Sequence, residues 1–458
     1  MERFDLIIVG TGSGNSLITP DFDHKRIAIV ERGVFGGTCL NRGCIPSKML
    51  IYPADIVEQV RHAARLGVDA HVDGVRWDDL VHRVFGRIDP IATAGEQYRE
   101  GLDHVTVCHG HGRFVDHKVL DVGGRRITAD QIVLAAGARP HIPPIAGLDT
   151  IEYHTSDTIM RLPRAPQRLV VLGGGYIACE LGHVFDAVGS DVTFVLRRDL
   201  MLREEDDEVS RRFTELYRRR FDVRVNSGIA AVRPIGDSSA SIAITLADGG
   251  EIEADALLIA TGRVPNADEL DVAATGVAVD GDGYVIVDEH QRTSVEGIWA
   301  LGDISNPAQL KHAANAEARV VSHNLVHPTD LHRVELGALP HAVFANPQVA
   351  AVGATERALV EAGIPHHVAV RSYADTAYGW AMEDTTSFCK VLCHAETREL
   401  LGAHLMGPQA PTLIQPLVQA MRFGQTVDQI AHDLYYIHPA LTEVVEQALL
   451  ALPGGRTG

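Results

Sequence analysis

The sequence has little of several features that define whole classes of protein. It contains six cysteines in 458 residues, which is too few for a disulfide scaffold. No apolar run reaches the roughly 18 residues of a membrane-spanning helix. The N-terminus enters an apolar segment at once, without the basic stretch and cleavage site of a secretory signal. We therefore expect a cytoplasmic protein, in which any disulfide is transient and catalytic.

Basic residues are also in deficit. The 41 Lys and Arg residues face 60 Asp and Glu residues, which gives a net charge of −19. A chain this acidic repels polyanions, so we exclude nucleic acid as a partner. Glycine, by contrast, is abundant at 43 residues, and its conformational freedom predicts many tight turns or ligand-binding loops. The length predicts about three domains, at roughly 100–200 residues per domain.

The first 31 residues have the pattern of a dinucleotide-binding unit. An apolar run at 6–9 enters the glycine-rich turn 10–14, and a second apolar run ends at Glu31. Such a turn presents backbone N–H groups and a helix dipole to a pyrophosphate, and a carboxylate at the second strand end accepts hydrogen bonds from an adenosine ribose. A surface turn is the alternative interpretation. Asn15 replaces the third glycine of the usual pattern and Pro20 follows, so we expect a short, broken helix with a different helix–strand contact.

A second unit of the same plan begins near residue 168. Its apolar run enters the turn Gly173-Gly174-Gly175, and its second apolar run ends at Arg197, followed by Arg198 and Arg203. Guanidinium groups bind a 2′-phosphate that a carboxylate at this position would repel. We therefore expect FAD in the first unit and NADPH in the second. A solvated arginine cluster is the alternative.

Cys39 and Cys44 lie five residues apart in a glycine-rich stretch that follows the first unit. In an ideal α-helix this spacing separates the Cα atoms by roughly 8–9 Å, beyond the roughly 7 Å that a disulfide spans. A disulfide between them requires a distorted backbone, which Gly43 permits. No second Cys/His pair accompanies them to complete a four-ligand zinc site, so we expect no metal; two unrelated buried thiols are the other alternative. The remaining cysteines are interpreted as packing residues: Cys108, Cys179, Cys389 and Cys393.

Together these motifs resemble those of the flavin-dependent pyridine nucleotide–disulfide reductases, over essentially the whole chain. The resemblance implies that Cys39 and Cys44 form a redox-active disulfide. It also implies an ion pair of Lys48 and Glu180 beside the flavin, and a nicotinamide pocket gated by Tyr176. The segment from His438 to Glu443 is similar to the family's catalytic His–Glu segment, which reaches the active site of the partner subunit. The resemblance therefore implies a homodimer.

The resemblance also implies an α/β fold with two Rossmann-like dinucleotide-binding domains and a C-terminal α+β dimerisation domain. We expect a discontinuous FAD-binding domain at 1–150 and 274–336, an NADPH-binding domain at 151–273 and an interface domain at 337–458. The residues expected to bind FAD are Gly10, Gly12, Gly14, Glu31, Thr38, Lys48, Gly112, Gly137 and Asp303. Those expected to bind NADPH are Gly173, Gly175, Tyr176, Ile177, Glu180, Arg197, Arg198, Arg203 and Gly262.

Within the family, the opening loop and the short insert after it look most like members that reduce the disulfide of a sugar–inositol thiol. We expect NADPH-dependent reduction of such a small-molecule disulfide. Three alternatives stay open: reduction of another small disulfide such as that of glutathione, NAD-linked oxidation of dihydrolipoamide, and a redox sensor without turnover. Arg42 lies between the two cysteines and is either a solvated residue or a cation that favours the thiolate form of a cysteine. Tyr98 is a weaker candidate for a functional residue near the substrate cleft. A cis peptide bond before Pro439 is a further hypothesis.

Overall fold

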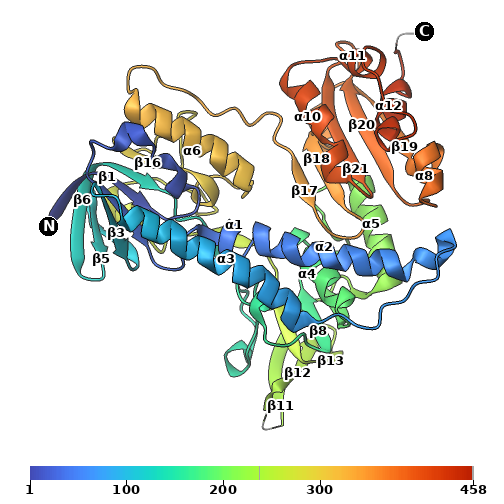
Figure 1. Ribbon diagram of the computed structural model, residues 1–458, viewed down its shortest axis with the longest axis horizontal. Coiled ribbons are helices and arrows are strands. Elements are labelled where there is room, and N and C mark those ends of the chain that lie inside the picture. Colours follow the sequence, from blue (N-terminus) through green and yellow to red (C-terminus); the bar gives the residue numbers. More distant parts are fainter. Residues whose placement is uncertain (237, 456–458) are drawn as a thin grey trace.

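The computed structural model describes residues 1–236 and 238–455, whose strands form several separate sheets. In Figure 1 the C-terminal unit stands at the upper right, and a long segment without regular structure joins it to helix α6. No helix within the described residues is long and apolar enough to cross a membrane.

The first sheet has the strand order β3-β2-β1-β6-β5-β4, with β16 beside β6. Its strands are β1 (Glu2–Val9), β2 (Ile27–Glu31), β3 (Val105–His109), β4 (Gly112–Asp116), β5 (Val119–Val122), β6 (Arg125–Leu134) and β16 (Ile298–Ala300). β1 runs parallel to β2 and β6, and its residues Ile7 and Ile8 are fully buried in two different cores. Both faces of the sheet are therefore covered, as its continuous apolar strands predict. The pairing of β16 with β6 brings the chain back to its first sheet after the second unit. The exact boundaries of the FAD-binding, NADPH-binding and interface domains stay predictions.

The connection from β1 to β2 contains no α-helix, only the 3₁₀ turns η1 (Gly14–Leu17) and η2 (Pro20–Phe22). This confirms the short, broken helix expected there. A Cβ atom on Gly14 would lie 2.9 Å from Ile8 Cγ2, so Gly14 makes the close contact with the strand. Asn15 is held instead by Arg99, whose Nε donates to Asn15 Oδ1 at 2.8 Å.

Four α-helices also lie within the segments that form the first unit. They are α1 (Gly37–Asn41), α2 (Cys44–Arg61), α3 (Trp77–Glu100) and α6 (Lys311–Val326). The other 3₁₀ turns are η3 (Ala63–Leu66), η4 (Leu148–Thr150), η5 (Ile159–Arg161), η6 (Val272–Thr275), η7 (Gly302–Ile304) and η8 (Tyr373–Asp375). Helix α2 continues from the first unit onto helix α4 of the second, so the two nucleotide units are packed together through it.

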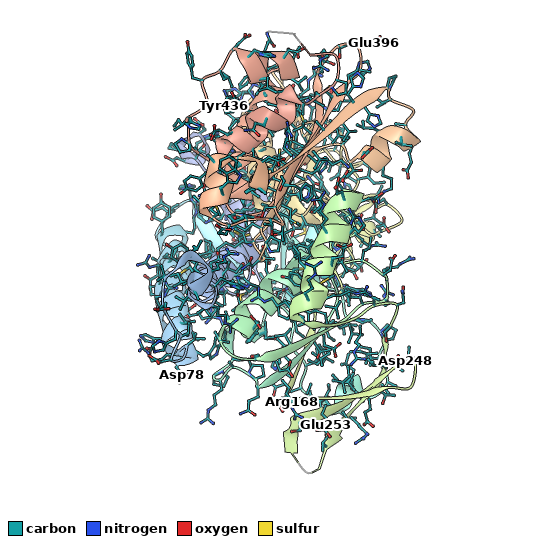
Figure 2. The ribbon with its side chains drawn as sticks, turned by 90° about the vertical axis from the view of Figure 1, so that its right-hand side faces the viewer. Asp78, Arg168, Asp248, Glu253, Glu396 and Tyr436 are labelled. Carbon is teal, nitrogen blue, oxygen red and sulfur yellow. The ribbon has the colours of Figure 1, made fainter. Side chains whose placement is uncertain are left out.

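The second unit has a parallel sheet of order β10-β9-β8-β14. Its strands and helices are β8 (Arg168–Leu172), α4 (Tyr176–Ala187), β9 (Asp191–Val195), α5 (Asp207–Arg220), β10 (Asp222–Arg224) and β14 (Ala256–Ile259). An antiparallel sheet is formed by β11 (Ile229–Ile235), β12 (Ser238–Leu246) and β13 (Glu251–Ala254), and β7 (Ala138–Pro140) pairs with β15 (Arg263–Pro265). In Figure 2 the ion pair of Arg168 with Glu253, 3.0 Å between nitrogen and oxygen, lies low on this unit.

The C-terminal unit is an antiparallel sheet of order β17-β18-β21-β20-β19 covered by short helices. Its strands are β17 (His341–Val343), β18 (Val349–Gly353), β19 (His366–Ser372), β20 (Phe388–His394) and β21 (Leu400–Met406). Its helices are α7 (Glu356–Glu361), α8 (Ala377–Ala381), α9 (Ala410–Leu413), α10 (Gln415–Arg422), α11 (Val427–His432) and α12 (Thr442–Leu450). This is the α+β unit that the sequence predicts. The four cysteines interpreted as packing residues are all buried.

A buried charge pair ties the second unit to the C-terminal unit. Lys390 Nζ lies 2.7 Å from Asp206 Oδ1, and their side chains are 4% and 1% exposed. Glu356 supplies a second carboxylate to the same ammonium group at 2.6 Å. The pair is fully desolvated, so breaking it would leave an uncompensated buried charge. It therefore holds α5 beneath the C-terminal sheet, as Figure 2 shows.

Candidate active site

A cavity of about 2080 Å³ is lined by both nucleotide units and by the start of the C-terminal unit. This volume exceeds the roughly 300–1,000 Å³ of a typical small-molecule site. Both glycine-rich turns line it, and so do the two candidate redox cysteines and strand β17. The cavity therefore offers room for two dinucleotides that meet near the cysteines.

The first glycine-rich turn is shaped for a close approach of backbone to ligand. Gly10 has φ of 105°, and a Cβ atom there would lie 2.3 Å from the Ala135 carbonyl oxygen. The Glu31 carboxylate accepts hydrogen bonds from the backbone N–H groups of Thr11, at 3.0 Å, and of Gly33, at 2.8 Å. It is thereby fixed at the cavity wall, in the position expected of a ribose acceptor.

The second turn repeats this geometry. Gly173 has φ of 131°, and a Cβ atom there would lie 2.2 Å from the Ala260 carbonyl oxygen. The three arginines that follow β9 all line the cavity: Arg197, Arg198 and Arg203. The glycine turn and the guanidinium groups are thus two parts of one wall, which suits a phosphorylated dinucleotide.

The backbone between the two cysteines is broken where the sequence predicts a distortion. Helix α1 contains Cys39 and ends at Asn41, and Cys44 opens helix α2. A Cβ atom on Gly43 would lie 3.0 Å from the Thr38 carbonyl oxygen, closer than a side chain tolerates without displacement. Both thiols are free in the structure and line the cavity, so it describes the reduced, dithiol form of the pair.

The two thiols differ strongly in acidity. The hydrogen bond from Cys39 lowers the pKa of Cys44 to about 7, against the opposing effect of burial, and the charge of Lys48 lowers it further. The same hydrogen bond, followed by burial, raises the pKa of Cys39 well above its usual range. Cys44 is therefore the thiolate of the pair, and Cys39 holds the proton.

Lys48 and Glu180 form the ion pair that the resemblance implies. Lys48 Nζ lies 2.8 and 2.6 Å from the two carboxylate oxygens of Glu180, a residue that is only 4% exposed. The Phe344 backbone N–H donates to the same carboxylate at 3.0 Å. The pair thereby joins α2, α4 and the end of β17. Tyr176, at the start of α4, stands half-exposed at the cavity wall.

Asp303 lies in η7 at the cavity wall, and two cations near it were missed by sequence reasoning. Burial raises the pKa of Asp303, and the charges of Arg263 and Lys311 oppose that rise. Lys311 Nζ also donates to Ser13 Oγ at 2.8 Å, and its charge acts on Cys39. Only five lysines occur in the chain, and this scarcity is the one signal that could have drawn attention to Lys311.

Most other predicted cofactor residues also line the cavity. They are Gly12, Thr38, Gly112, Gly137, Gly175, Ile177 and Gly262. Gly14 is the exception, because it packs against the strand and is not among the lining residues. Arg42 pairs with Asp157 at 3.3 Å. The cations that lower the pKa values of the two thiols are instead Lys48 and Lys311. Tyr98 is an exposed residue of α3.

His438 and Glu443 form a hydrogen-bonded pair at the surface of the C-terminal unit. His438 Nδ1 lies 2.7 Å from Glu443 Oε1; the histidine side chain is 73% exposed and the glutamate 13%. The peptide bond before Pro439 is cis, as hypothesised. Neither residue of the pair lines the cavity of its own chain. Within one chain, the structure therefore does not bring the pair to the cysteines.

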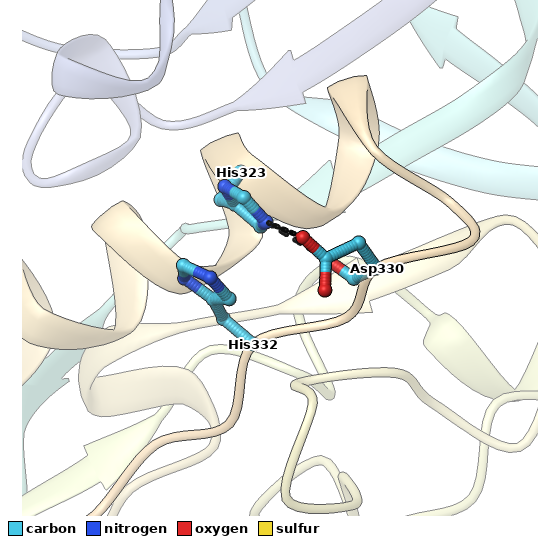
Figure 3. Close-up of side chains that lie close together, drawn as sticks. All are labelled: His323, Asp330 and His332. Carbon is cyan, nitrogen blue, oxygen red and sulfur yellow. Dashed lines mark hydrogen bonds and ion pairs between the residues drawn. The ribbon is translucent and has the colours of Figure 1, made fainter.

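Two further clusters in the described residues have distances compatible with a metal ion. In the first, His323 Nε2 donates to the Asp330 carbonyl oxygen at 2.9 Å, and the ring of His323 stacks on that of His332 with centroids 3.5 Å apart (Figure 3). Lone pairs of stacked imidazoles lie in parallel planes and do not converge on one ion. In the second, each ring nitrogen of His109 already faces a carboxylate. We assign a metal to neither cluster.

Residues 4–319 match the pyridine nucleotide-disulphide oxidoreductase family, and residues 339–449 match the dimerisation domain of the same family. The chain is 50% identical to mycothione reductase of Mycobacterium tuberculosis, over 99% of this chain and 100% of that protein. It is 32% identical to dihydrolipoyl dehydrogenase of Corynebacterium glutamicum, over 99% and 98% of the two chains.

A solved structure also matches the fold of this chain. The HOCl-induced flavoprotein disulfide reductase RclA from Escherichia coli matches with a TM-score of 0.85 and 25% identity, over 98% of this chain and 99% of that chain. The expected fold class is confirmed by this match and by the two family matches. The protein therefore belongs to the pyridine nucleotide-disulphide oxidoreductases, a family of enzymes that use a flavin and a pyridine nucleotide and carry a dimerisation domain.

Proposed function

We propose that this enzyme is a homodimeric, cytoplasmic reductase that uses NADPH and FAD to convert mycothione, the disulfide of mycothiol, to two molecules of mycothiol. The observation that carries the proposal is the Cys39–Cys44 dithiol, with its acidic Cys44 thiol, at the wall of a two-nucleotide cavity. The choice of substrate is supported by 50% identity to a mycothione reductase over the full length of both chains.

The residues at the first turn fit FAD. The cradle at Gly10 excludes a side chain, Glu31 is a fixed ribose acceptor, and Asp303 is a half-buried carboxylate with cations beside it. When bound, FAD supplies the relay of two electrons between the nucleotide and the cysteine pair. Arg197, Arg198 and Arg203 suit the 2′-phosphate of NADPH, because guanidinium groups bind phosphate bidentately.

Lys48, Glu180 and Tyr176 surround the place where the two cofactors meet. The Lys48 ammonium, anchored by both oxygens of Glu180, presents a fixed positive charge beside the cysteine pair. A fixed cation there stabilises the Cys44 thiolate without reorganisation. Tyr176 covers the nicotinamide pocket until the nucleotide enters.

The thiol chemistry uses the acidity difference between the cysteines. Cys39 passes its proton to His438 of the partner subunit, and the Cys39 thiolate attacks one sulfur of mycothione. The substrate S–S bond breaks, a mixed disulfide forms on Cys39, and the first mycothiol leaves with the proton from that imidazole. The Cys44 thiolate then attacks the Cys39 sulfur, expels the second mycothiol as a thiolate that takes a proton from solution, and re-forms the Cys39–Cys44 disulfide.

The role of the partner subunit follows from the position of His438. This side chain is 73% exposed and does not line the cavity of its own chain. His438 Nδ1 lies 2.7 Å from Glu443 Oε1, and this contact leaves the Nε2 atom of His438 free for proton transfer. A second copy that supplies this imidazole completes each site.

The test is an NADPH-oxidation assay with mycothione, glutathione disulfide and lipoamide side by side. We expect mycothione to be reduced at least tenfold more efficiently than the other two. Equal or greater activity with glutathione disulfide would overturn the mycothiol assignment, and a preference for NADH with lipoamide would indicate a dihydrolipoyl dehydrogenase. The Cys39→Ser variant is the control, and its activity with mycothione should fall to background.

A further inference from the structure

A second polar pair joins the two helices that carry Lys48 and Glu180. His183 lies in α4 and Asp55 lies in α2, and His183 Nε2 is 2.9 Å from Asp55 Oδ1. The His183 side chain is fully buried, whereas that of Asp55 is 28% exposed. The two helices lie side by side (Figure 1). The thiol chemistry proposed above uses Lys48 and Glu180 and leaves this second pair without a role.

The spacing of the four residues places both pairs along one contact between the helices. Asp55 follows Lys48 by seven residues, which is close to two turns of an α-helix, and His183 follows Glu180 by three, which is close to one turn. Residues at these spacings share a helix face. Each helix therefore presents both of its residues to the other helix, and the two pairs are successive links between α2 and α4.

Both ring nitrogens of His183 are used, and their roles are fixed. Arg220, at the end of α5, has its Nη2 atom 3.4 Å from His183 Nδ1. A guanidinium group only donates hydrogen bonds, so Nδ1 accepts and Nε2 carries the hydrogen that is donated to Asp55. Asp186, one turn further along α4, binds Arg220 and Arg61. The ring is thus held in one orientation by α2 on one side and α5 on the other.

A buried hydrogen bond of this kind fixes how two helices sit on each other. The residues beside it form a small apolar cluster of Ala54 and Val57 on α2 and Ala187 on α4. Contacts between such short side chains change little when one helix slides or turns on the other. A hydrogen bond, by contrast, requires a narrow range of distance and angle, and a buried donor that loses its acceptor is costly. The directional bond therefore selects one register of α2 on α4.

This register in turn places the ammonium group of Lys48. Cys44 opens α2 one turn before Lys48, so the position of α2 on α4 sets where the ammonium group meets its carboxylate. We propose that Asp55 and His183 are positioning residues: their hydrogen bond fixes α2 on α4 and thereby holds Lys48 against both oxygens of its partner. The inference depends neither on the substrate nor on the nucleotide proposed above.

The ion pair at the far end of the contact contributes less to the register. Arg61 Nη1 lies 2.7 Å from Asp186 Oδ2, and their side chains are 38% and 22% exposed. Ion pairs with this access to solvent are weak, because water and salt screen them. The buried bond of His183 is therefore the point at which a substitution should loosen the register most.

The experiment measures how readily Lys48 leaves its partner in the holoenzyme. Trace acetylation with acetic anhydride, followed by peptide mass spectrometry, gives the rate at Lys48 relative to Lys118, which lies between β4 and β5. Acetylation requires the Lys48 nitrogen to leave Glu180. We expect Asp55→Ala and His183→Leu to raise the relative rate about five- to tenfold, the effect of losing one buried hydrogen bond. Asp55 is partly exposed, so Asp55→Ala keeps the test decisive if His183→Leu does not fold.

Two conservative variants and one control separate positioning from general destabilisation. His183→Gln keeps an N–H donor and Asp55→Asn keeps an oxygen acceptor, so both should stay within about twofold of wild type. Tyr217→Phe removes a different buried hydrogen bond on α4, from the Tyr217 hydroxyl to the Cys179 carbonyl oxygen at 3.2 Å. It should leave the relative rate unchanged, because this bond does not involve α2.

An unchanged relative rate at Lys48 in Asp55→Ala would overturn the inference. A rise of the same size in Tyr217→Phe would overturn it too, because loss of any buried bond on α4 would then suffice. Glu180→Gln removes the charge of the partner itself and should give the largest rise. No disulfide substrate or nucleotide enters the measurement, so a wrong assignment of either would leave its outcome unaffected.

Discussion

The thiols of Cys39 and Cys44 share a hydrogen bond across the break between helices α1 and α2, and this bond lowers the pKa of Cys44 to about 7. Gly43 lies at this break, where the Cβ atom of any larger residue would lie 3.0 Å from the Thr38 carbonyl oxygen. The close backbone approach at Gly43 lies at the break between the two helices, and the hydrogen bond between the thiols, together with the charge of Lys48, makes Cys44 the more acidic of the two.

The acidity of Cys44 predicts the pH dependence of its alkylation. Only the thiolate reacts, so the iodoacetamide rate at Cys44 of the reduced enzyme should rise with pH through a midpoint near 7. Cys39→Ala removes the hydrogen-bond donor and Lys48→Met removes the nearby cation, so each should move the midpoint toward the ordinary value of about 8.5. Peptide mapping by mass spectrometry measures the rate at Cys44. Lys118→Met, at a lysine outside the cavity, is the control, and a midpoint that stays near 7 in all three variants would contradict the assignment.

Replacement of Gly43 by alanine tests the close approach at the helix break. The added Cβ atom would lie 3.0 Å from the Thr38 carbonyl oxygen, so we expect a loss of about 1–3 kcal/mol in the free energy of unfolding. Disulfide formation between the two cysteines should also slow. Gly86→Ala, in helix α3, is the matched control, because nothing lies within 4 Å of its added Cβ and it should stabilise by about 0.5–1 kcal/mol. Equal effects at the two glycines would refute the explanation.

The arginines after β9 predict the nucleotide preference. Arg203→Ala should raise the KM for NADPH about tenfold, because a charge-assisted contact to the 2′-phosphate is lost. The KM for NADH, which has no such phosphate, should change less than twofold. Arg219→Ala changes an exposed arginine that does not line the cavity and should leave both values unchanged. An equal rise for both nucleotides in Arg203→Ala would place this arginine outside the phosphate site.

A shared active site predicts complementation between two inactive variants. Cys39→Ser and His438→Gln should each reduce mycothione at less than about 1% of the wild-type rate, since each removes a group of the thiol exchange. Denatured together and refolded as a random mixture, half of the dimers are mixed and each holds one intact site, so about a quarter of the activity should return. No recovery, with mixed dimers shown by native mass spectrometry, would mean that His438 acts within its own chain.

The parts of the fold that could be predicted from the sequence are those that local patterns specify. The apolar run into Gly10, the second strand ending at Glu31 and the repeat of this plan at Gly173 each lie in one short segment, where strand, turn and helix preferences act between neighbours. The cysteine spacing around Gly43 is equally local, and it predicts the helix break correctly. Gly14 shows the limit: it looks like part of the phosphate loop, but the strand beneath it decides its contact.

The sequence by itself therefore determined the two nucleotide units, the cysteine pair and the arginine cluster after β9, because each of these signals lies within one short segment. Only the tertiary structure decided which distant groups meet. Lys311 reaches Ser13 across 298 positions. The pairing of Lys48 with Glu180 across 132 positions was expected only from the family resemblance. Glu205 meets His341 only because α5 packs beneath the C-terminal sheet. Such contacts follow from strand order and from the packing of whole units, which no single stretch of sequence specifies.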